Sequence, residues 1–233
     1  MRSDERPSRM EGDLGTVEEF ADNSTEGQSV RGFLHRAVAA DADGLVLTHG
    51  AGANCQSPLL TALAEAFCAS GITVLRCDLP FRQKRPHGPP PLGSAEHDQA
   101  GLRAAVSILR RQTGGRIFLG GHSYGGRQAS MLAAAEPGLV EALLLLSYPL
   151  HPPKRPSELR TKHFPDLRTP ALFVHGTRDG FGSPAELGEA LKLIPGPTAM
   201  LQVEGSGHEL LTAKNRSELP GRVVNTFGAF IAR

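Results

Sequence analysis

A serine flanked by glycines is the first candidate for chemistry in this sequence. GHSYG at residues 121–125 fits the pattern G-x-S-x-G, follows the apolar run RIFLG and opens a helix-like stretch at 126–135. A sharp strand–turn–helix junction of this kind exposes the serine hydroxyl, and glycines supply the clearance that the turn requires. Ser123 is therefore predicted to be a nucleophile. The pattern alone also fits a glycine-rich turn with an idle serine.

A serine nucleophile needs a neighbouring base, and the base needs an acid that orients it. VEGSGH places His208 just past the last apolar run, and HGTRDG places Asp179 just past the apolar run ALFVH. The order Ser123, Asp179, His208 suits a triad built on loops that follow parallel strands, so these residues are predicted as nucleophile, acid and base. The alternatives are a surface histidine in a glycine loop and an aspartate that only forms a turn with Gly180.

The developing negative charge on the substrate oxygen needs two backbone N–H donors. One is expected from Tyr124, the residue after the serine, and the other from the loop THGAGAN at residues 48–54. Ala51 is the preferred second donor and Gly52 is the alternative. A phosphate-binding reading is disfavoured, because this loop lacks the Gly-Lys-Ser/Thr ending of a P-loop and does not fit G-x-G-x-x-G.

The elements that must position these residues alternate between short apolar runs and amphipathic stretches. Such a pattern favours an α/β fold with a doubly wound, mostly parallel sheet, which binds ligands at the carboxyl ends of its strands. The expected parallel strands are 45–48, 72–77, 116–119, 140–147, 171–175 and 199–203, after an antiparallel start at 16–21 and 30–38. Helix starts are predicted at Ser57-Pro58, at Ser94 and at the capping box that begins with Ser183, and the last helix is expected to carry the apolar residues from 223 to 231.

Several further residues could reach the site. Arg82, in the basic and then proline-rich stretch RQKRPHGPPP, and Arg127 are candidate substrate contacts. The competing expectations are a solvated surface loop for residues 82–91 and an ion-pair anchor for Arg127. Cys55 is expected to be a small buried group rather than a reactive thiol. Residues 148–168 are too few and too proline-rich for a large cap domain, so we expect an open site.

Composition excludes several classes of protein. The 233 residues suit one domain, taken as residues 15–233 after a flexible leader at 1–14. With 25 Lys and Arg against 24 Asp and Glu, no basic field for nucleic acid or an anionic membrane exists. No run is long and apolar enough to cross a membrane, and MRSDERPSRMEGD lacks the apolar stretch of a secretory signal. Three cysteines without a CxxC pair suggest a reducing, cytoplasmic location. The nine histidines show no metal-binding spacing, so neither a metal nor another cofactor is expected.

LTHGAGAN, GGHSYGGRQAS, LFVHGTRD and GSGHEL together resemble the α/β-hydrolase superfamily over nearly the whole chain from about residue 15. Within it, HGAG combined with DLPFR resembles a bacterial dienelactone-hydrolase-like group that is related to the testis-expressed-30 proteins and to a subunit of the NSL histone-acetyltransferase complex. The resemblance implies an eight-stranded sheet and a serine hydrolase mechanism. Dienelactone hydrolase itself uses a cysteine nucleophile where this sequence has Ser123, so its lactone substrate is not carried over.

Two functions from different classes are compatible with these patterns. The first is a hydrolase of small ester or thioester substrates that works through an acyl-enzyme on Ser123. The second is a non-catalytic interaction protein that keeps the fold as a scaffold. A scaffold has no need of a complete triad together with both oxyanion segments, so the sequence favours the enzyme. The physiological substrate and the oligomeric state do not follow from the sequence.

Overall fold

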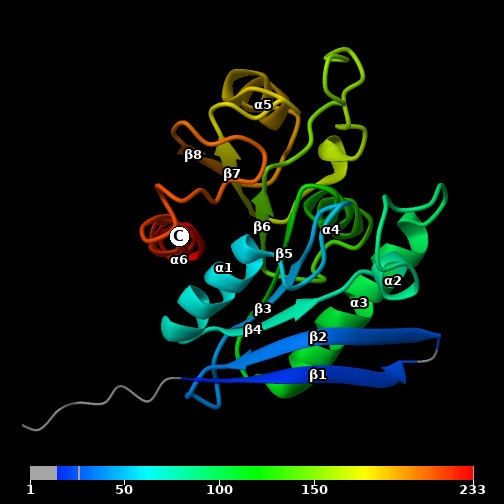
Figure 1. Ribbon diagram of the computed structural model, residues 1–233, viewed down its shortest axis with the longest axis vertical. Coiled ribbons are helices and arrows are strands. Elements are labelled where there is room, and N and C mark those ends of the chain that lie inside the picture. The colour runs from blue at the N-terminus through cyan, green and yellow to red at the C-terminus, as the bar shows by residue number, and fades with distance from the viewer. Residues whose placement is uncertain (1–14, 26, 233) are drawn as a thin grey trace, which may run out of the picture.

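One sheet of eight strands organises the computed structural model, which describes residues 15–25 and 27–232 (Figure 1). The strand order is β1-β2-β4-β3-β5-β6-β7-β8. β2 pairs antiparallel with β1 and β4, and the other neighbours pair in parallel. The strands are β1 Thr16–Thr25, β2 Gln28–Arg36, β3 Gly44–Thr48, β4 Thr73–Cys77, β5 Ile117–His122, β6 Ala142–Leu146, β7 Ala171–Gly176 and β8 Thr198–Val203. The predicted mostly parallel, eight-stranded sheet is confirmed, and the predicted leader at 1–14 lies outside the described residues.

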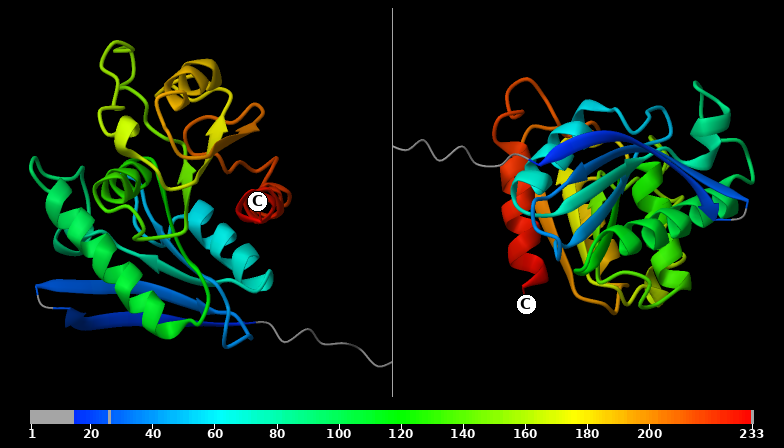
Figure 2. Two further views of the ribbon diagram at one scale, coloured as in Figure 1. Left: turned by 180° about the vertical axis from the view of Figure 1, so that it is seen from behind. Right: turned by 90° about the horizontal axis from the view of Figure 1, so that it is seen from below.

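Helices cover both faces of the sheet, as the view from below shows (Figure 2). α1 and α6 pack with apolar side chains of the central strands on one face, and α3, α4 and α5 pack on the other. Because both faces are covered, β3, β4, β5, β6 and β7 are buried along their whole length, which explains their continuous apolar runs. The helices are α1 Pro58–Ala69, α2 Pro80–Lys84, α3 Ala95–Gln112, α4 Tyr124–Ala135, α5 Pro184–Leu191 and α6 Leu219–Ile231, with a 3₁₀ turn at Phe164–Asp166.

The ends of the elements follow local chemistry in some places and tertiary contacts in others. Ser183 forms the predicted capping box with Glu186, and each residue bonds the backbone N–H of the other. Ser57 and Ser94 occupy N-cap positions, but neither side chain makes a capping bond. β6 is shorter than the predicted 140–147, because Ser147 adopts a φ of 46° and turns the chain out of the sheet.

The stretch predicted as a surface loop from residue 82 to 91 begins instead as the end of α2. Pro80 occupies the first turn of this helix, where its missing N–H costs nothing, and the helix continues to Lys84. Arg82 is buried, with a relative exposure of 4%. The expectation of a solvated loop was therefore wrong for Arg82 and Gln83, because their tertiary contacts draw this part of the helix into the protein. Lys84 is helical but exposed. Residues 85–89 are exposed as predicted.

No large cap covers the carboxyl ends of the strands in the described part of the chain. Between β6 and β7 the only regular element is the 3₁₀ turn at Phe164–Asp166. The segment is held in place by Tyr148, whose buried hydroxyl donates a 2.6 Å bond to the Arg160 carbonyl. The described helices also include none that is both long and apolar enough to span a membrane.

Candidate active site

Ser123 stands at the junction between β5 and α4 in a strained backbone conformation. Its φ of 50° and ψ of −114° lie outside the regions that L-residues prefer, and its N–H is tied to the Leu146 carbonyl at 2.8 Å. The turn closes because its glycines lack side chains. A Cβ on Gly121 would lie 2.7 Å from the Gly125 carbonyl carbon, and one on Gly125 would lie 2.5 Å from the His49 oxygen. The sharp turn that the sequence predicts is therefore formed.

The structure brings Ser123, His208 and Asp179 together from three loops. His208 Nδ1 lies 3.0 and 2.9 Å from the two carboxylate oxygens of Asp179, and His208 Nε2 lies 2.8 Å from Ser123 Oγ. A carboxylate only accepts hydrogen bonds, so Nδ1 carries the proton and Nε2 is left to accept the serine hydroxyl proton. This is the tautomer that a general base for Ser123 requires.

The environment of Asp179 keeps its carboxylate charged. Burial by itself would raise the pKa of Asp179, but hydrogen bonds from the His208 ring and the Phe181 N–H, together with electrostatic attraction from His208 and His175, hold it below its usual value. The Asp179 side chain is fully buried, whereas His208 is partly open. A buried, ionised carboxylate orients the imidazole and stabilises the positive charge that forms on it.

The loops that carry Asp179 and His208 are built against each other. A Cβ on Gly176 would lie 2.4 Å from the Ser206 oxygen, so glycine allows the end of β7 to touch the histidine loop. The Arg178 N–H donates to the same Ser206 oxygen at 2.9 Å. Gly205, at a φ of 71°, supplies the left-handed turn that starts this loop.

The loop at residues 48–54 lies directly beside Ser123, the candidate nucleophile. A Cβ on Gly50 would lie 3.4 Å from Ser123 Cβ and 3.0 Å from His122 Nδ1. Ala51 is half-buried and Gly52 is exposed. Tyr124 is the first residue of α4, and its hydroxyl donates to Asp98 at 2.8 Å. Both candidate oxyanion segments are thus adjacent to Ser123, as their predicted roles require.

Three residues of the site were not anticipated from the sequence. His122, the residue before the candidate nucleophile, donates from Nε2 to the His208 carbonyl at 2.8 Å. The ring of Phe181 lies over the His208 imidazole with centroids 4.2 Å apart. Buried Asp98 accepts bonds from both the Phe81 N–H and the Tyr124 hydroxyl, which joins α2, α3 and α4. Only His122 carried a sequence signal, through its place inside the serine motif.

The two predicted arginine contacts have different surroundings. The guanidinium of Arg82 bonds four main-chain carbonyls. Arg127, half-buried one turn after Ser123, makes no ion pair among the described residues, so the expectation of an ion-pair anchor was wrong. Burial, with the added charge of Arg127, lowers the pKa of His163 to about 4.

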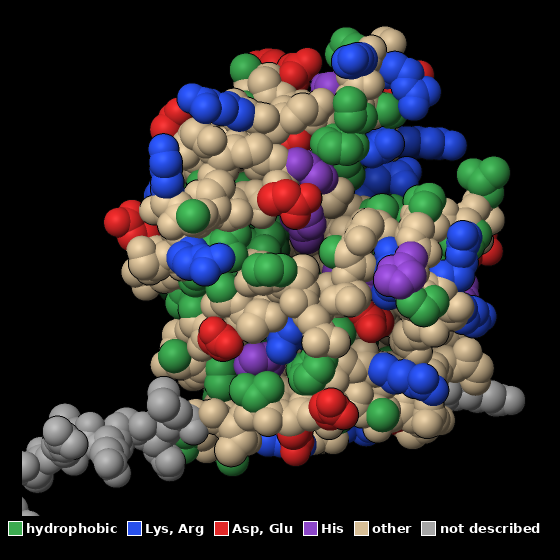
Figure 3. Space-filling model, in the orientation of Figure 1, with side chains coloured by type: hydrophobic (Ala, Val, Ile, Leu, Met, Phe, Trp, Pro, Cys, Tyr) green, Lys and Arg blue, Asp and Glu red, His purple; other side chains and the backbone are tan. Residues whose placement is uncertain are grey.

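Histidines reach the surface near the middle of the face in Figure 3, and Lys and Arg side chains line the hollow to their right.

The remaining candidates for chemistry are the cysteine thiols and the side chains that could bind a metal. Cys55 is almost fully buried, and burial raises the pKa of its thiol to about 12, so it stays protonated as a small core group. The three cysteines are free. Across residues 15–25 and 27–232, no three His, Cys, Asp or Glu side chains are grouped so that they could hold a metal ion.

Comparison with known proteins agrees with this architecture. The alpha/beta hydrolase domain family matches residues 41–226. The chain belongs to the α/β-hydrolase family. The superfamily resemblance is therefore confirmed, and membership supports a hydrolase activity in general.

Solved structures of this family share the fold at low sequence identity. The esterase Est1E from Butyrivibrio proteoclasticus is 15% identical, with 92% of this chain and 99% of that chain covered at a TM-score of 0.75. A dienelactone hydrolase from Anabaena variabilis is 20% identical, with 92% of this chain and 98% of that chain covered at a TM-score of 0.70. An α/β serine hydrolase without a lid from Xanthomonas campestris is 18% identical, with 91% of this chain and 94% of that chain covered at a TM-score of 0.72. The fold that this α/β hydrolase shares with these structures thus extends over nearly its whole length.

Proposed function

We propose that this α/β hydrolase is a serine hydrolase that cleaves ester or thioester bonds of small substrates through an acyl-enzyme on Ser123. The observation that carries the proposal is the hydrogen-bonded chain from Ser123 Oγ to His208 Nε2 at 2.8 Å and from His208 Nδ1 to the buried Asp179 carboxylate at 2.9 Å. A nucleophile, a base in the required tautomer and an acid that orients the base are the minimal set for acyl transfer.

In the proposed reaction His208 Nε2 takes the hydroxyl proton as Ser123 Oγ attacks the substrate carbonyl carbon. The carbonyl oxygen becomes an oxyanion and accepts hydrogen bonds from the backbone N–H groups of Tyr124 and Ala51. His208 then gives its proton to the leaving alcohol or thiol, and the acyl group stays on Ser123. Water, deprotonated by His208, attacks the acyl carbon, and the acid leaves as the Ser123 hydroxyl regains its proton.

Small substrates are proposed because the walls of the site offer little apolar surface. Between β6 and β7 the protein has only the segment from 147 to 170, which is proline-rich and basic. Leu92 is fully exposed, so its side chain does not fold inward to add apolar surface to these walls. A long acyl chain gains about 0.8 kcal/mol per methylene only where an apolar wall receives it. Arg127 is proposed as a substrate contact at the rim; Arg82, with its bonds to carbonyls, is not.

Labelling with a fluorophosphonate, followed by peptide mapping, tests the proposal. The wild-type protein is expected to be labelled on Ser123, and Ser123→Ala is expected to abolish labelling. Ser130→Ala is a matched control, because Ser130 is also buried and its Oγ also lies 2.8 Å from a histidine nitrogen, that of His163. A wild-type protein that is folded but not labelled would contradict the proposal and favour the scaffold reading.

A further inference from the structure

Arg82 is a buried arginine whose hydrogen bonds go to main-chain carbonyls. Its Nε donates to the Ala53 oxygen at 2.8 Å, and its Nη2 donates to the Ala51 oxygen at 2.7 Å. Its Nη1 donates to the Arg85 oxygen, and Nη2 donates also to the Gly88 oxygen, both at 2.9 Å. Four of the five guanidinium N–H groups are thereby used, which leaves little capacity to bind a substrate.

Two of the four carbonyls belong to the loop beside the nucleophile. Ala51 and Ala53 lie on opposite sides of Gly52, an exposed residue where a Cβ would meet no atom within 4 Å. A segment of small residues with one exposed glycine has little packing of its own to hold it in one conformation. The guanidinium, with its donors in a rigid planar fork, fixes both peptide groups at once.

His49 holds the peptide group between Gly50 and Ala51 through its carbonyl. The Leu79 N–H donates to His49 Nε2 at 3.1 Å, so this nitrogen carries no proton. The ring is fully buried, and burial lowers the pKa of His49, so the imidazole is neutral and its proton sits on Nδ1. Nδ1–H then donates to the Gly50 carbonyl at 2.8 Å, a carbonyl that also accepts from the Ala53 N–H at 3.2 Å.

The carbonyl and the N–H of a trans peptide point in opposite directions. With the Gly50 carbonyl turned toward the buried His49 ring, the Ala51 N–H of the same peptide points away from the core. With the Ala51 carbonyl turned toward Arg82, the Gly52 N–H points away from the guanidinium. The directions of the two candidate oxyanion donors, the Ala51 N–H and the Gly52 N–H, thus depend on two fixed carbonyls, one held by His49 and one by Arg82.

We propose that Arg82 is a positioning residue that holds the Ala51 and Ala53 carbonyls and so keeps the Ala51 N–H aimed at the substrate oxygen above Ser123. The inference deepens the proposed serine hydrolase function and rests on it. Through the Arg85 and Gly88 carbonyls the same side chain joins the oxyanion loop to the exposed segment that follows α2.

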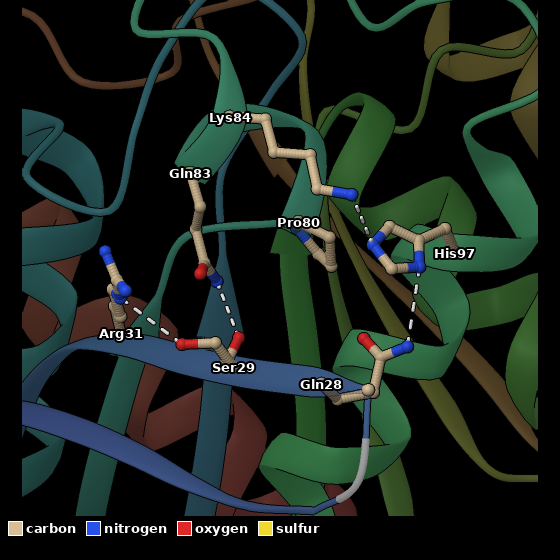
Figure 4. Close-up of a pocket in the computed structure, with 8 residues that line it drawn as sticks. Gln28, Ser29, Arg31, Pro80, Gln83, Lys84 and His97 are labelled. Carbon is tan, nitrogen blue, oxygen red and sulfur yellow. Dashed lines mark hydrogen bonds between the residues drawn. The ribbon is translucent and has the colours of Figure 1, made fainter.

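The test compares Arg82→Met, which keeps an unbranched stem, with Gln83→Met on the same helix. Gln83 points from α2 toward β2, where its Nε2 donates to the Ser29 carbonyl at 2.8 Å (Figure 4). The same nitrogen donates to the carbonyl of Asp78, just after β4, at 3.0 Å. It lines a separate cavity of about 250 Å³ and makes no bond to residues 48–54. Each variant is assayed for kcat and KM on p-nitrophenyl acetate and for inhibition by phenylboronic acid, which forms a tetrahedral adduct on a serine.

Arg82→Met is expected to lower kcat by about 10- to 100-fold with KM changed by less than about threefold, because a misplaced oxyanion donor weakens only the transition state. The inhibition constant of phenylboronic acid is expected to rise by a similar factor, since its adduct mimics the charged intermediate. Arg82→Lys is expected to lie between, because one ammonium group cannot hold both carbonyls in fork geometry. Gln83→Met is expected to match the wild type in all three values.

Hydrogen exchange supplies a readout that does not depend on activity. Amides of residues 49–55 are expected to exchange faster in Arg82→Met than in Gln83→Met, while those of the sheet are unchanged. If Arg82→Met does not fold, Arg82→Lys takes its place in both measurements. Kinetics and exchange equal to those of Gln83→Met would overturn the inference, as would a raised KM at unchanged kcat. Absence of wild-type labelling by the fluorophosphonate would instead overturn the proposed function itself, together with the catalytic part of the inference.

Discussion

His122 Nε2 donates a 2.8 Å hydrogen bond to the main-chain carbonyl of His208. The residue before the candidate nucleophile therefore holds the loop of the candidate base. Burial lowers the pKa of His122, so the ring is neutral at pH 7 and spends its Nε2 proton on this carbonyl. The two rings lie with centroids 5.2 Å apart. This hydrogen bond thus holds the main chains of the Ser123 turn and the His208 loop together without using the side chain of Ser123 or of His208.

Replacing this donor tests its positioning role. His122→Phe keeps a ring but loses the bond, and it is expected to lower kcat/KM on p-nitrophenyl acetate by about 10- to 100-fold, because small displacements of a base slow proton transfer strongly. His122→Gln can present an N–H near the same place and is expected to retain more activity. Equal losses in the two variants would show that the ring itself, and not the hydrogen bond, is what matters.

Loss of the acid is expected to be severe. Asp179→Asn leaves the size of the side chain unchanged but favours the wrong His208 tautomer, so kcat is expected to fall by about 10³- to 10⁴-fold. Steady-state kinetics on p-nitrophenyl acetate measure the change. Asp166→Asn, at an exposed position outside the site, serves as the control and is expected to keep wild-type rates. A loss below about tenfold for Asp179→Asn would remove Asp179 from the triad.

A preference for short acyl chains is expected because the described residues form no large cap over the site. We expect kcat/KM on p-nitrophenyl esters to be highest from acetate to butyrate and to decline for longer chains, because no apolar wall is available to bury further methylenes. Rates are also expected to show no jump when a short ester exceeds its solubility, since no lid has to open at an interface. A chain-length series decides the matter, and an optimum at decanoate or beyond would contradict the short-acyl proposal.

Acid sensitivity of the fold is expected from His35. Burial first, and the charge of Arg76 second, lower its pKa from 6.5 to about 4, while its Nε2 accepts a 2.8 Å bond from Arg76 Nε. Below pH 6.5 the unfolded chain binds a proton that the native state refuses until about pH 4, so stability declines as the pH falls through this window. At pH 5 this effect lowers the free energy of unfolding by about 2 kcal/mol relative to neutral pH.

Urea unfolding at pH 7 and pH 5 measures this effect. His35→Gln keeps an acceptor for Arg76 but does not titrate, so its free energy of unfolding is expected to change less between the two pH values than that of the wild type. His97→Gln, at a partly exposed histidine, is the control and is expected to follow the wild type. An unchanged pH dependence in His35→Gln would mean that His35 is not the responsible group.

The tight junction around Ser123 is expected to make Gly125 intolerant of substitution. In Gly125→Ala the new Cβ would lie 2.5 Å from the His49 oxygen and 2.6 Å from Thr48 Cγ2, so either the elbow or the oxyanion loop must move. We expect loss of fluorophosphonate labelling together with a lower melting temperature. In Gly228→Ala, in α6, the new Cβ would meet no atom within 4 Å, so this control is expected to leave the melting temperature unchanged or slightly raised.

Local patterns in the sequence determined much of this architecture. Continuous apolar runs predicted the buried parallel strands, because a strand covered on both faces has no polar face to display. Glycines around Ser123 and the loops after two later strands predicted which residues would converge, because parallel strands end at one edge of the sheet. The proximity of Ser123, Asp179 and His208 could thus be anticipated from residue types and chain order alone.

Tertiary structure alone decided how these groups are held. Arg82 read as a surface cation, because its neighbours in sequence are charged and prolines follow; its burial depends on carbonyls of Ala51 and Ala53, about 30 residues away. The bond from His122 to the His208 carbonyl spans 86 positions in the chain. Contacts of this kind leave no periodic signal, since each depends on where two distant backbones meet once the sheet has formed. The candidate catalytic side chains are therefore visible in the sequence, whereas the hydrogen bonds that position them emerge only in the folded protein.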